Sequence, residues 1–220
     1  MRKLIFCLSL LFSLFTPFVF CLRNEAQDSS DLQDKTIIDL HLSSATLLET
    51  LGELAVHHRV PIGFEIAADD DEQPRLTLDI NRASLEQVME LIIHQVPKYE
   101  WQIRDGVVNI QPKDSSGTFL DRLLNTRISH YTAPKNATKF EIRNAIFDLD
   151  EVKRVLAMDK MKISKLDYFT YPSIYSKEVD LSITNTDVRG VLNKVARDSE
   201  HKIWVVHLKG ENRDSVEIAF

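Results

Sequence analysis

The side chains best suited to metal chemistry in this chain are seven histidines and one short acidic run. His57 and His58 are adjacent and so point to different sides of a helix, and the other five histidines show no metal-ligand spacing such as His-x-x-x-His. Asp69–Glu72 is acidic but lacks the alternating oxygen ligands and the central glycine of an EF-hand loop. We therefore expect no metal site, and we interpret the acidic run as a solvated loop.

Nucleophilic and phosphate chemistry also lack a motif. The six glycines form no phosphate-binding loop, and no Gly-x-Ser-x-Gly sequence is present. Cys7 and Cys21 both lie near the N-terminus, so a chain cleaved after Cys21 would have neither a disulfide nor a thiol. We predict no catalytic residues and no cofactor. A small envelope enzyme is the less favoured alternative.

The N-terminus has the pattern of a secretory signal, because two basic residues precede the uncharged run Leu4–Leu22. The best cleavage point is after Cys21, which makes residues 1–21 the predicted signal peptide. A run of this length is also compatible with an uncleaved N-terminal anchor. A lipoprotein fits less well, because the bulky Phe20 directly precedes Cys21. We expect a periplasmic or otherwise exported protein that contacts a membrane only through an uncleaved N-terminal segment.

The chain is acidic, with a formal net charge of −6 at pH 7. Loss of the two basic residues of the signal would change the charge to −8, and such a surface repels nucleic acid, which we exclude as a partner. Residues 22–35 are polar and without an apolar period, which predicts a flexible tether. The remaining residues suffice for one or two domains.

The clearest folding pattern lies in Arg75–Pro112. An alternating strand is followed by Ser84–Gln87, which has the form of a capping box at a helix start. Asp105-Gly106 then separates two short strands, Tyr99–Arg104 and Val107–Gln111, as in a tight hairpin. The predicted order is β-α-β-β. The apolar face of the helix consists of Leu85, Val88, Met89, Ile92 and Val96.

The preceding segment predicts a similar unit. Thr36–Leu42 alternates as a strand, Thr46–Glu49 is a second capping box, and Val60–Ile66 is a further strand. The first domain is therefore predicted over residues 36–112, as β-α-β followed by β-α-β-β. The apolar side of its first strand is expected to consist of Ile38, Leu40 and Leu42.

A shift of 103 residues repeats the pattern further along the chain, where nine apolar positions agree, including Trp101 with Trp204. Upstream of these positions the match is looser. We expect a second, diverged copy at 138–220, joined to the first by a connector at 113–137 that contains a short helix. The fold class is therefore predicted as α+β, with two tandem small domains of mixed sheets and helices packed on one face. The looser matches to the first strand, helix and second strand are Lys139–Ile142, Leu149–Met158 and Lys165–Thr170.

Several of these motifs resemble the short N-terminal domain shared by secretins and TonB-dependent receptors. The resemblance is carried by Leu76–Ile80, Ala83–Gln87, Tyr99–Ile103 and Gly106–Ile110. It implies a periplasmic module that contacts other envelope proteins, with a secretin, a TonB-dependent receptor or an anti-sigma regulator as the partner. The chain shows no pore domain, barrel or TonB box, so the resemblance implies docking and no transport.

An edge strand of a small mixed sheet can recruit a strand from a partner. We expect the outer strand of either hairpin, Val107–Gln111 or Glu217–Phe220, to do so. We also expect both tryptophans to pack in cores, since each alternates with an apolar residue on its strand. A subunit that forms rings or other homo-oligomers is the alternative. The candidate partner-binding residues are Val107, Val108, Asn109, Glu217 and Ile218.

Overall fold

The computed structural model describes residues 32–67, 74–133, 137–164, 181–200 and 202–220. The helices are α3 (Leu47–Val56), α4 (Leu85–Gln95), α5 (Phe119–Leu124), α6 (Lys139–Asp148), α7 (Asp150–Met158) and α8 (Val188–Asp198). The strands are β1 (Thr36–Thr46), β2 (Ile62–Glu65), β3 (Arg75–Ser84), β4 (Tyr99–Arg104), β5 (Val107–Pro112), β6 (Arg127–Thr132), β7 (Lys162–Ile163), β8 (Ser182–Asp187), β9 (Ile203–Lys209) and β10 (Ser215–Ala219).

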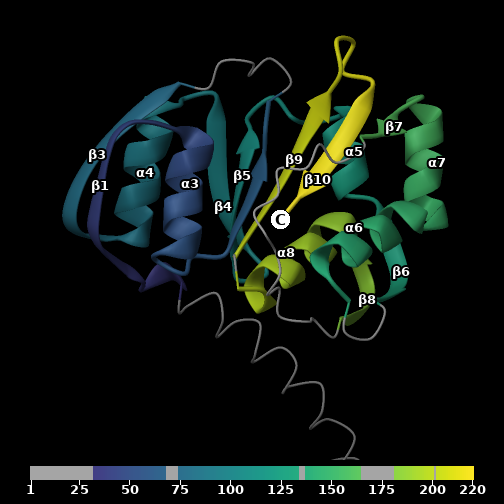
Figure 1. Ribbon diagram of the computed structural model, residues 1–220, viewed down its shortest axis with the longest axis horizontal. Helices are drawn as coiled ribbons and strands as arrows, with labels where there is room; N and C mark the ends of the chain where they lie inside the picture. The colour runs from purple at the N-terminus through teal and green to yellow at the C-terminus, as the bar shows by residue number, and fades with distance from the viewer. Residues whose placement is uncertain (1–31, 68–73, 134–136, 165–180, 201) are drawn as a thin grey trace, which may run out of the picture.

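Most strands belong to one mixed sheet of six strands in the order β4-β5-β2-β9-β10-β7. Two antiparallel ribbons, β1–β3 and β6–β8, lie apart from it, with helices between each ribbon and the central sheet (Figure 1). The predicted α+β class with mixed sheets is confirmed.

The second half of the chain repeats the strand pairings of the first. In the N-terminal unit, β1 to β5, the β1–β3 ribbon is antiparallel and β5 pairs parallel with β2 and antiparallel with β4. In the C-terminal unit, β6 to β10, the β6–β8 ribbon is antiparallel and β10 pairs parallel with β7 and antiparallel with β9. The units are joined by a parallel pairing of β2 with β9, which places Gly63 beside Trp204. They therefore share one sheet, an arrangement that the sequence did not predict.

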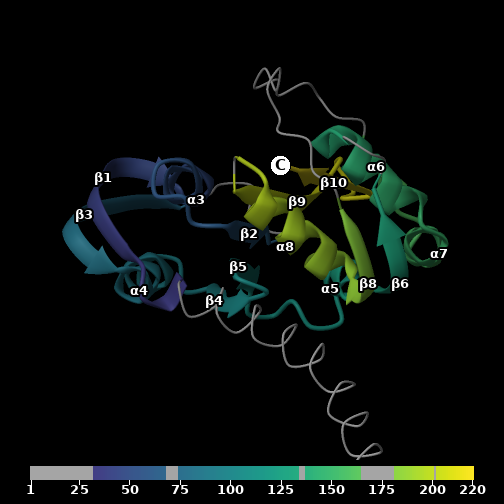
Figure 2. The same cartoon turned by 90° about the horizontal axis from the view of Figure 1, so that it is seen from below.

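The shared sheet separates two hydrophobic cores. On β9, Val205 belongs to the core of the N-terminal unit, whereas its neighbours Trp204 and Val206 belong to the core of the C-terminal unit. Figure 2 shows α3 and α4 at one end of the molecule and α6 and α7 at the other, with β2, β5 and β9 between them. The helices of the two units consequently cover opposite faces of the sheet.

The local signals of the N-terminal unit form as predicted. Thr46 and Ser84 each complete a capping box, and Asp105 and Gly106 have φ angles of 55° and 68°, which a two-residue hairpin turn requires. The apolar face of α4 is buried against the first core. These features depend on residues that are neighbours in sequence.

The burial pattern of β1 differs from the prediction. Ile37 and Leu40 are buried, whereas Ile38 is 49% exposed. Asp39 adopts a left-handed conformation, with φ of 56°, and this shifts the alternation of side chains in the middle of the strand. The predicted apolar side is therefore wrong for Ile38 and right for Leu40.

Two predictions for the second half are corrected. Lys139–Ile142 begins helix α6 and is no strand, and the counterpart of β1 is β6, which lies inside the predicted connector. Ile128 pairs with Thr186 as Ile37 pairs with Ala83, so β6 is shifted by 91 residues from β1, while the tryptophans are shifted by 103. Two helices, α6 and α7, follow β6 where α3 alone follows β1, and a constant shift cannot align both parts.

Other predictions for the connector and the second helix agree with the structure. The short helix is α5, and the predicted helix Leu149–Met158 corresponds to α7. The predicted signal peptide at 1–21, the acidic run Asp69–Glu72 and the predicted strand Lys165–Thr170 lie outside the described residues.

The folded part of the chain begins before Thr36. Leu32, at the end of the predicted tether, is 7% exposed and packs into the core of the N-terminal unit. Within the described residues, we find no helix that combines the length and apolar character needed to cross a bilayer.

Lys139, at the start of α6, makes the stability of the protein vary with pH in the alkaline range. Its ammonium is buried and has no hydrogen-bond partner among the described residues. Burial lowers the pKa of Lys139 to about 8, and Glu200 opposes the change. Between pH 8 and the ordinary value of 10.5, the unfolded chain binds a proton that the folded chain does not, so the free energy of unfolding rises with pH there.

We expect Lys139→Met to remove this rise and to stabilise the protein by about 2 kcal/mol at pH 7. This value is smaller than the free energy that corresponds to the whole change in the pKa of Lys139, because the side chain is not completely buried. Urea unfolding of both proteins from pH 7 to 10.5 measures the difference. Parallel stability curves would contradict the prediction.

Candidate functional site

The six-stranded sheet ends in β4 on one side and β7 on the other. β4 pairs with β5 along its whole length, and no other strand of the described residues lies on its outer side. β7 has only two residues, and the structure describes the chain after it no further than Ser164 before resuming at Leu181. The outer side of β4 is therefore the longer open edge.

The predicted candidates Val107, Val108 and Asn109 do not lie on an outer strand. β5 pairs with β4 on one side and with β2 on the other, so Val108 has Ile103 and Ile62 as its two neighbours. All three candidate side chains are fully buried. The edge that we predicted for the first hairpin is wrong, because β2 occupies it.

The second pair of candidates, Glu217 and Ile218, is also buried. Both residues lie on β10, which pairs with β9 and, through its first residues, with β7. The Glu217 carboxylate is in an ion pair with Lys209, and Nε2 of His207 lies 3.4 Å from it. Burial lowers the pKa of His207, and Glu217 opposes this effect. The side chains of Glu217 and Ile218 are therefore not free to bind a partner, and β7 covers β10 only at Ser215 and Val216, with no described strand on that side of Glu217 and Ile218.

One signal distinguishes the two strands of the first hairpin in the sequence. On β4, the polar residues Glu100 and Gln102 alternate with apolar ones, as in a strand with one wet face. On β5, Val107-Val108-Asn109-Ile110 is nearly continuous in apolar character, as in a strand buried on both faces. This difference favours β4 as the outer strand.

Trp101 is the most prominent side chain at the edge. It is partly buried against the core of the N-terminal unit, and its indole Nε1 donates a hydrogen bond of 3.0 Å to Oε1 of Glu90 on α4. Tyr99, two residues earlier on the same face, is fully buried with its ring centroid 5.5 Å from that of Phe64. The edge therefore presents one fixed, incompletely covered indole.

Trp204 on β9 is the counterpart of Trp101 and has the same hydrogen bond. Its Nε1 donates to Oδ1 of Asn193 on α8 at 2.9 Å, and Asn193 lies 103 residues after Glu90 as Trp204 lies 103 residues after Trp101. Trp204 is fully buried, because β2 lies beside β9 and Gly63 lies over the indole. The prediction of core packing is confirmed for Trp204 and holds in part for Trp101.

The α8 face beside β9 is covered by the N-terminal unit. Arg189 forms a buried ion pair with Glu65 at the end of β2. The hairpin turn between β4 and β5 adds further contacts, among them hydrogen bonds that Asn193 and Arg197 donate to the backbone carbonyls of Arg104 (3.3 Å) and Asp105 (3.1 Å). One strand and one turn of the N-terminal unit thus cover α8.

The α4 face beside β4 is exposed in the described structure. Glu86, Glu90 and His94 occupy the positions that correspond to Arg189, Asn193 and Arg197. They surround Leu91, which is 48% exposed, in an open hollow of about 680 Å³. We call the outer side of β4 together with Glu86, Glu90, Leu91 and His94 the β4–α4 surface.

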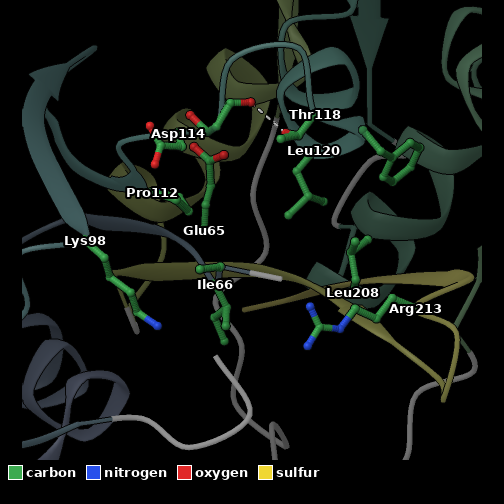
Figure 3. Close-up of a pocket in the computed structure, with 12 residues that line it drawn as sticks. Glu65, Ile66, Lys98, Pro112, Asp114, Thr118, Leu120, Leu208 and Arg213 are labelled. Atoms are coloured by element: carbon green, nitrogen blue, oxygen red, sulfur yellow. Dashed lines mark hydrogen bonds between the residues drawn. The ribbon is translucent and has the colours of Figure 1, made fainter. Parts of the chain in front are cut away.

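A separate cavity of about 300 Å³ lies where β2, β9 and the segment after β5 meet (Figure 3). Figure 3 shows Lys98 and Arg213 on the side of Ile66, away from Asp114 and Thr118. Burial raises the pKa of the Glu65 carboxyl in the wall, and Arg189 beside it opposes the rise. The size is at the lower limit of small-molecule pockets, and Glu65 already holds the two units together.

In the described residues, no three histidine, cysteine, aspartate or glutamate side chains lie close enough to hold a metal ion. Comparisons with protein-family models, curated proteins and solved structures find no match to this chain. The functional assignment therefore depends on the geometry of the β4–α4 surface.

Proposed function

We propose that this chain is an exported, non-catalytic protein–protein interaction module that binds a partner segment by strand pairing at the outer side of β4. One observation carries the proposal: β9, the counterpart of β4, has a parallel strand on the corresponding side, whereas β4 has none among the described residues. β4 thus offers, at the open edge of the sheet, the same backbone geometry with which β9 binds β2 inside the molecule.

The hairpin register indicates which backbone groups of β4 are available. In a two-residue hairpin, the residues that flank the turn form a hydrogen-bonded pair, and such pairs alternate along the strands. Arg104, Gln102 and Glu100 therefore direct their backbone groups toward β5. Trp101 and Ile103 direct their backbone groups outward. The corresponding residues of β9, Trp204 and Val206, direct theirs toward β2. There the Val206 carbonyl accepts a hydrogen bond of 3.0 Å from the Ile66 N–H.

We assign the module to an envelope secretion, transport or signalling system. Two sequence features support this assignment, the signal-like run Leu4–Leu22 and the resemblance of Leu76–Ile110 to the short N-terminal domain of secretins and TonB-dependent receptors. A secretin, a TonB-dependent receptor or an anti-sigma regulator is then the expected partner, and the tandem units would provide one open and one occupied edge.

Site-specific photo-crosslinking tests the proposal in cells. We expect a crosslinker in place of the exposed Gln102 to capture one discrete envelope protein, and a crosslinker in place of the exposed Lys153 on the distant α7 to capture none. Ile103→Pro removes an outward backbone N–H, which an edge strand tolerates, and should abolish the adduct without loss of the fold by circular dichroism. Ile103→Val is the matched control.

An adduct that persists in Ile103→Pro would rule out strand pairing, and an equal adduct from the α7 position would show that the capture is not specific. Val108→Pro is unsuitable for this purpose, because its N–H donates to the Pro61 carbonyl at 2.9 Å inside the sheet.

Self-assembly is the second candidate function, and the junction of the units favours it. The parallel pairing of β2 with β9 is a head-to-tail contact, and it leaves two unlike strands, β4 and β7, at the ends of the sheet. A head-to-tail contact of this kind between the end strands of neighbouring chains can repeat. Light scattering of the purified chain decides the matter, since self-assembly predicts a mass that rises with concentration and that falls to the monomer value in Ile103→Pro.

A further inference from the structure

We infer that the strand bound at β4 belongs to another protein, runs parallel to β4, carries glycine opposite Trp101, and carries lysine or arginine two residues later against Glu86. This inference rests on the proposed function and specifies its partner. It takes the β2–β9 junction as the template for the β4–α4 surface.

The glycine follows from the packing of Gly63 on Trp204. These residues are paired in the register of β2 with β9, and a Cβ on Gly63 would overlap the indole, coming within 2.7 Å of Nε1. Trp101 occupies the same place on β4 and is held by the same type of hydrogen bond from Nε1. A strand that lies flat against Trp101 needs the same absence of a side chain.

The basic residue follows from the charge at the first turn of the neighbouring helix. In the template, Glu65 stands two residues after Gly63 and pairs with Arg189, with both side chains at most 4% exposed. The position of Arg189 is occupied on α4 by Glu86, which is exposed. A carboxylate facing Glu86 would be repelled, whereas a cation there would form the reversed pair.

A second copy of this chain does not provide such a strand through β2. Its sequence, Ile62-Gly63-Phe64-Glu65, has the required glycine but the wrong charge. β2 is also paired on both sides, by β5 and β9, and cannot pair again without opening the sheet. The motif x-Gly-x-Lys/Arg on an extended segment of a different protein satisfies both requirements.

Fluorescence anisotropy with short labelled peptides tests the inference on the full chain. The probe has the sequence Val60–Ile66 with lysine in place of Glu65, and the comparison peptides keep Glu65 or add Gly63→Leu to the lysine peptide. We expect the lysine probe to bind about tenfold more tightly than the Glu65 peptide, and the leucine peptide to bind at least about tenfold more weakly than the probe.

Charge reversal on the protein provides the decisive comparison. Glu86→Lys should invert the preference between the lysine and glutamate peptides. Glu151→Lys is the matched control, because Glu151 is also the second residue of a helix and lies on α7, and it should leave the preference unchanged.

The outcomes separate this inference from the proposed function. Equal binding of lysine and glutamate peptides, or a preference that Glu86→Lys does not change, overturns the charge assignment, and equal binding of the leucine peptide overturns the glycine. If no peptide binds while the Gln102 crosslink forms, the inference fails and the docking function stands. If both are absent, the docking function fails as well. Self-association abolished by Ile103→Pro would replace the foreign partner with a second copy.

Discussion

Replacing Gly63 with alanine should lower the free energy of unfolding by about 3 kcal/mol. The added methyl group would overlap the indole of Trp204, which is fully buried and held by its hydrogen bond to Asn193. Because the ring cannot move without breaking that bond, the parallel pairing of β2 with β9 must open or shift. Urea unfolding followed by circular dichroism measures the loss.

The matched control for this substitution is Gly52→Ala. Gly52 lies inside α3, where an added Cβ meets no atom within 4 Å. Alanine is the better helix former, so this variant should be more stable than the wild type by about 0.5–1 kcal/mol. Opposite signs for the two substitutions would support the packing of Gly63 on the indole. Unchanged stability of Gly63→Ala would contradict it and remove the template for the β4–α4 surface.

Arg189→Met should destabilise the protein by about 3–5 kcal/mol at pH 7. The substitution leaves the Glu65 carboxylate buried without its partner at the junction of the two units. Burial already raises the pKa of Glu65, and loss of the guanidinium would raise it further. The carboxyl of the variant then binds a proton in the folded state before it does so in the unfolded chain, so the destabilisation should decrease as the pH falls below neutral.

A double substitution separates the cost of an unpaired charge from the value of the pair. Glu65→Leu combined with Arg189→Met removes both charges, and we expect it to recover most of the stability lost in the single variant. The control on the same helix is Asp198→Asn, which breaks the exposed pair with Lys194 and should cost under about 0.5 kcal/mol. If Arg189→Met were as stable as Asp198→Asn, the Glu65–Arg189 pair would not stabilise the junction of the two units.

The location of the open edge illustrates how far a single sequence can predict a binding site. Both strands of the first hairpin follow from the Asp105-Gly106 turn and its flanking apolar residues. Which of the two strands is outermost depends on where β2 pairs, and backbone hydrogen bonds carry no information about the identity of the partner strand. We therefore predicted β5 as the edge, whereas the structure has β4 there.

Local interactions explain what the sequence determined by itself. The capping boxes at Thr46 and Ser84, the hairpin turn and the apolar face of α4 involve residues a few positions apart, and their side-chain periods are characteristic of helix or strand. The equivalence of Trp101 and Trp204 was also recognisable, because a shift of 103 residues aligns them together with eight other apolar positions. In the structure, each indole donates a hydrogen bond to a residue eleven positions before it.

The tertiary structure alone decided that the two units share a sheet and which edge remains open. The parallel pairing of β2 with β9 joins residues about 140 positions apart, and it is stabilised by the fit of Gly63 to Trp204 and of Glu65 to Arg189. Neither fit has a period or a motif in the sequence. The shared sheet arises because helices pack on its opposite faces and bring the four-residue strand β2 beside β9. The same arrangement leaves β4 without a neighbour among the described residues.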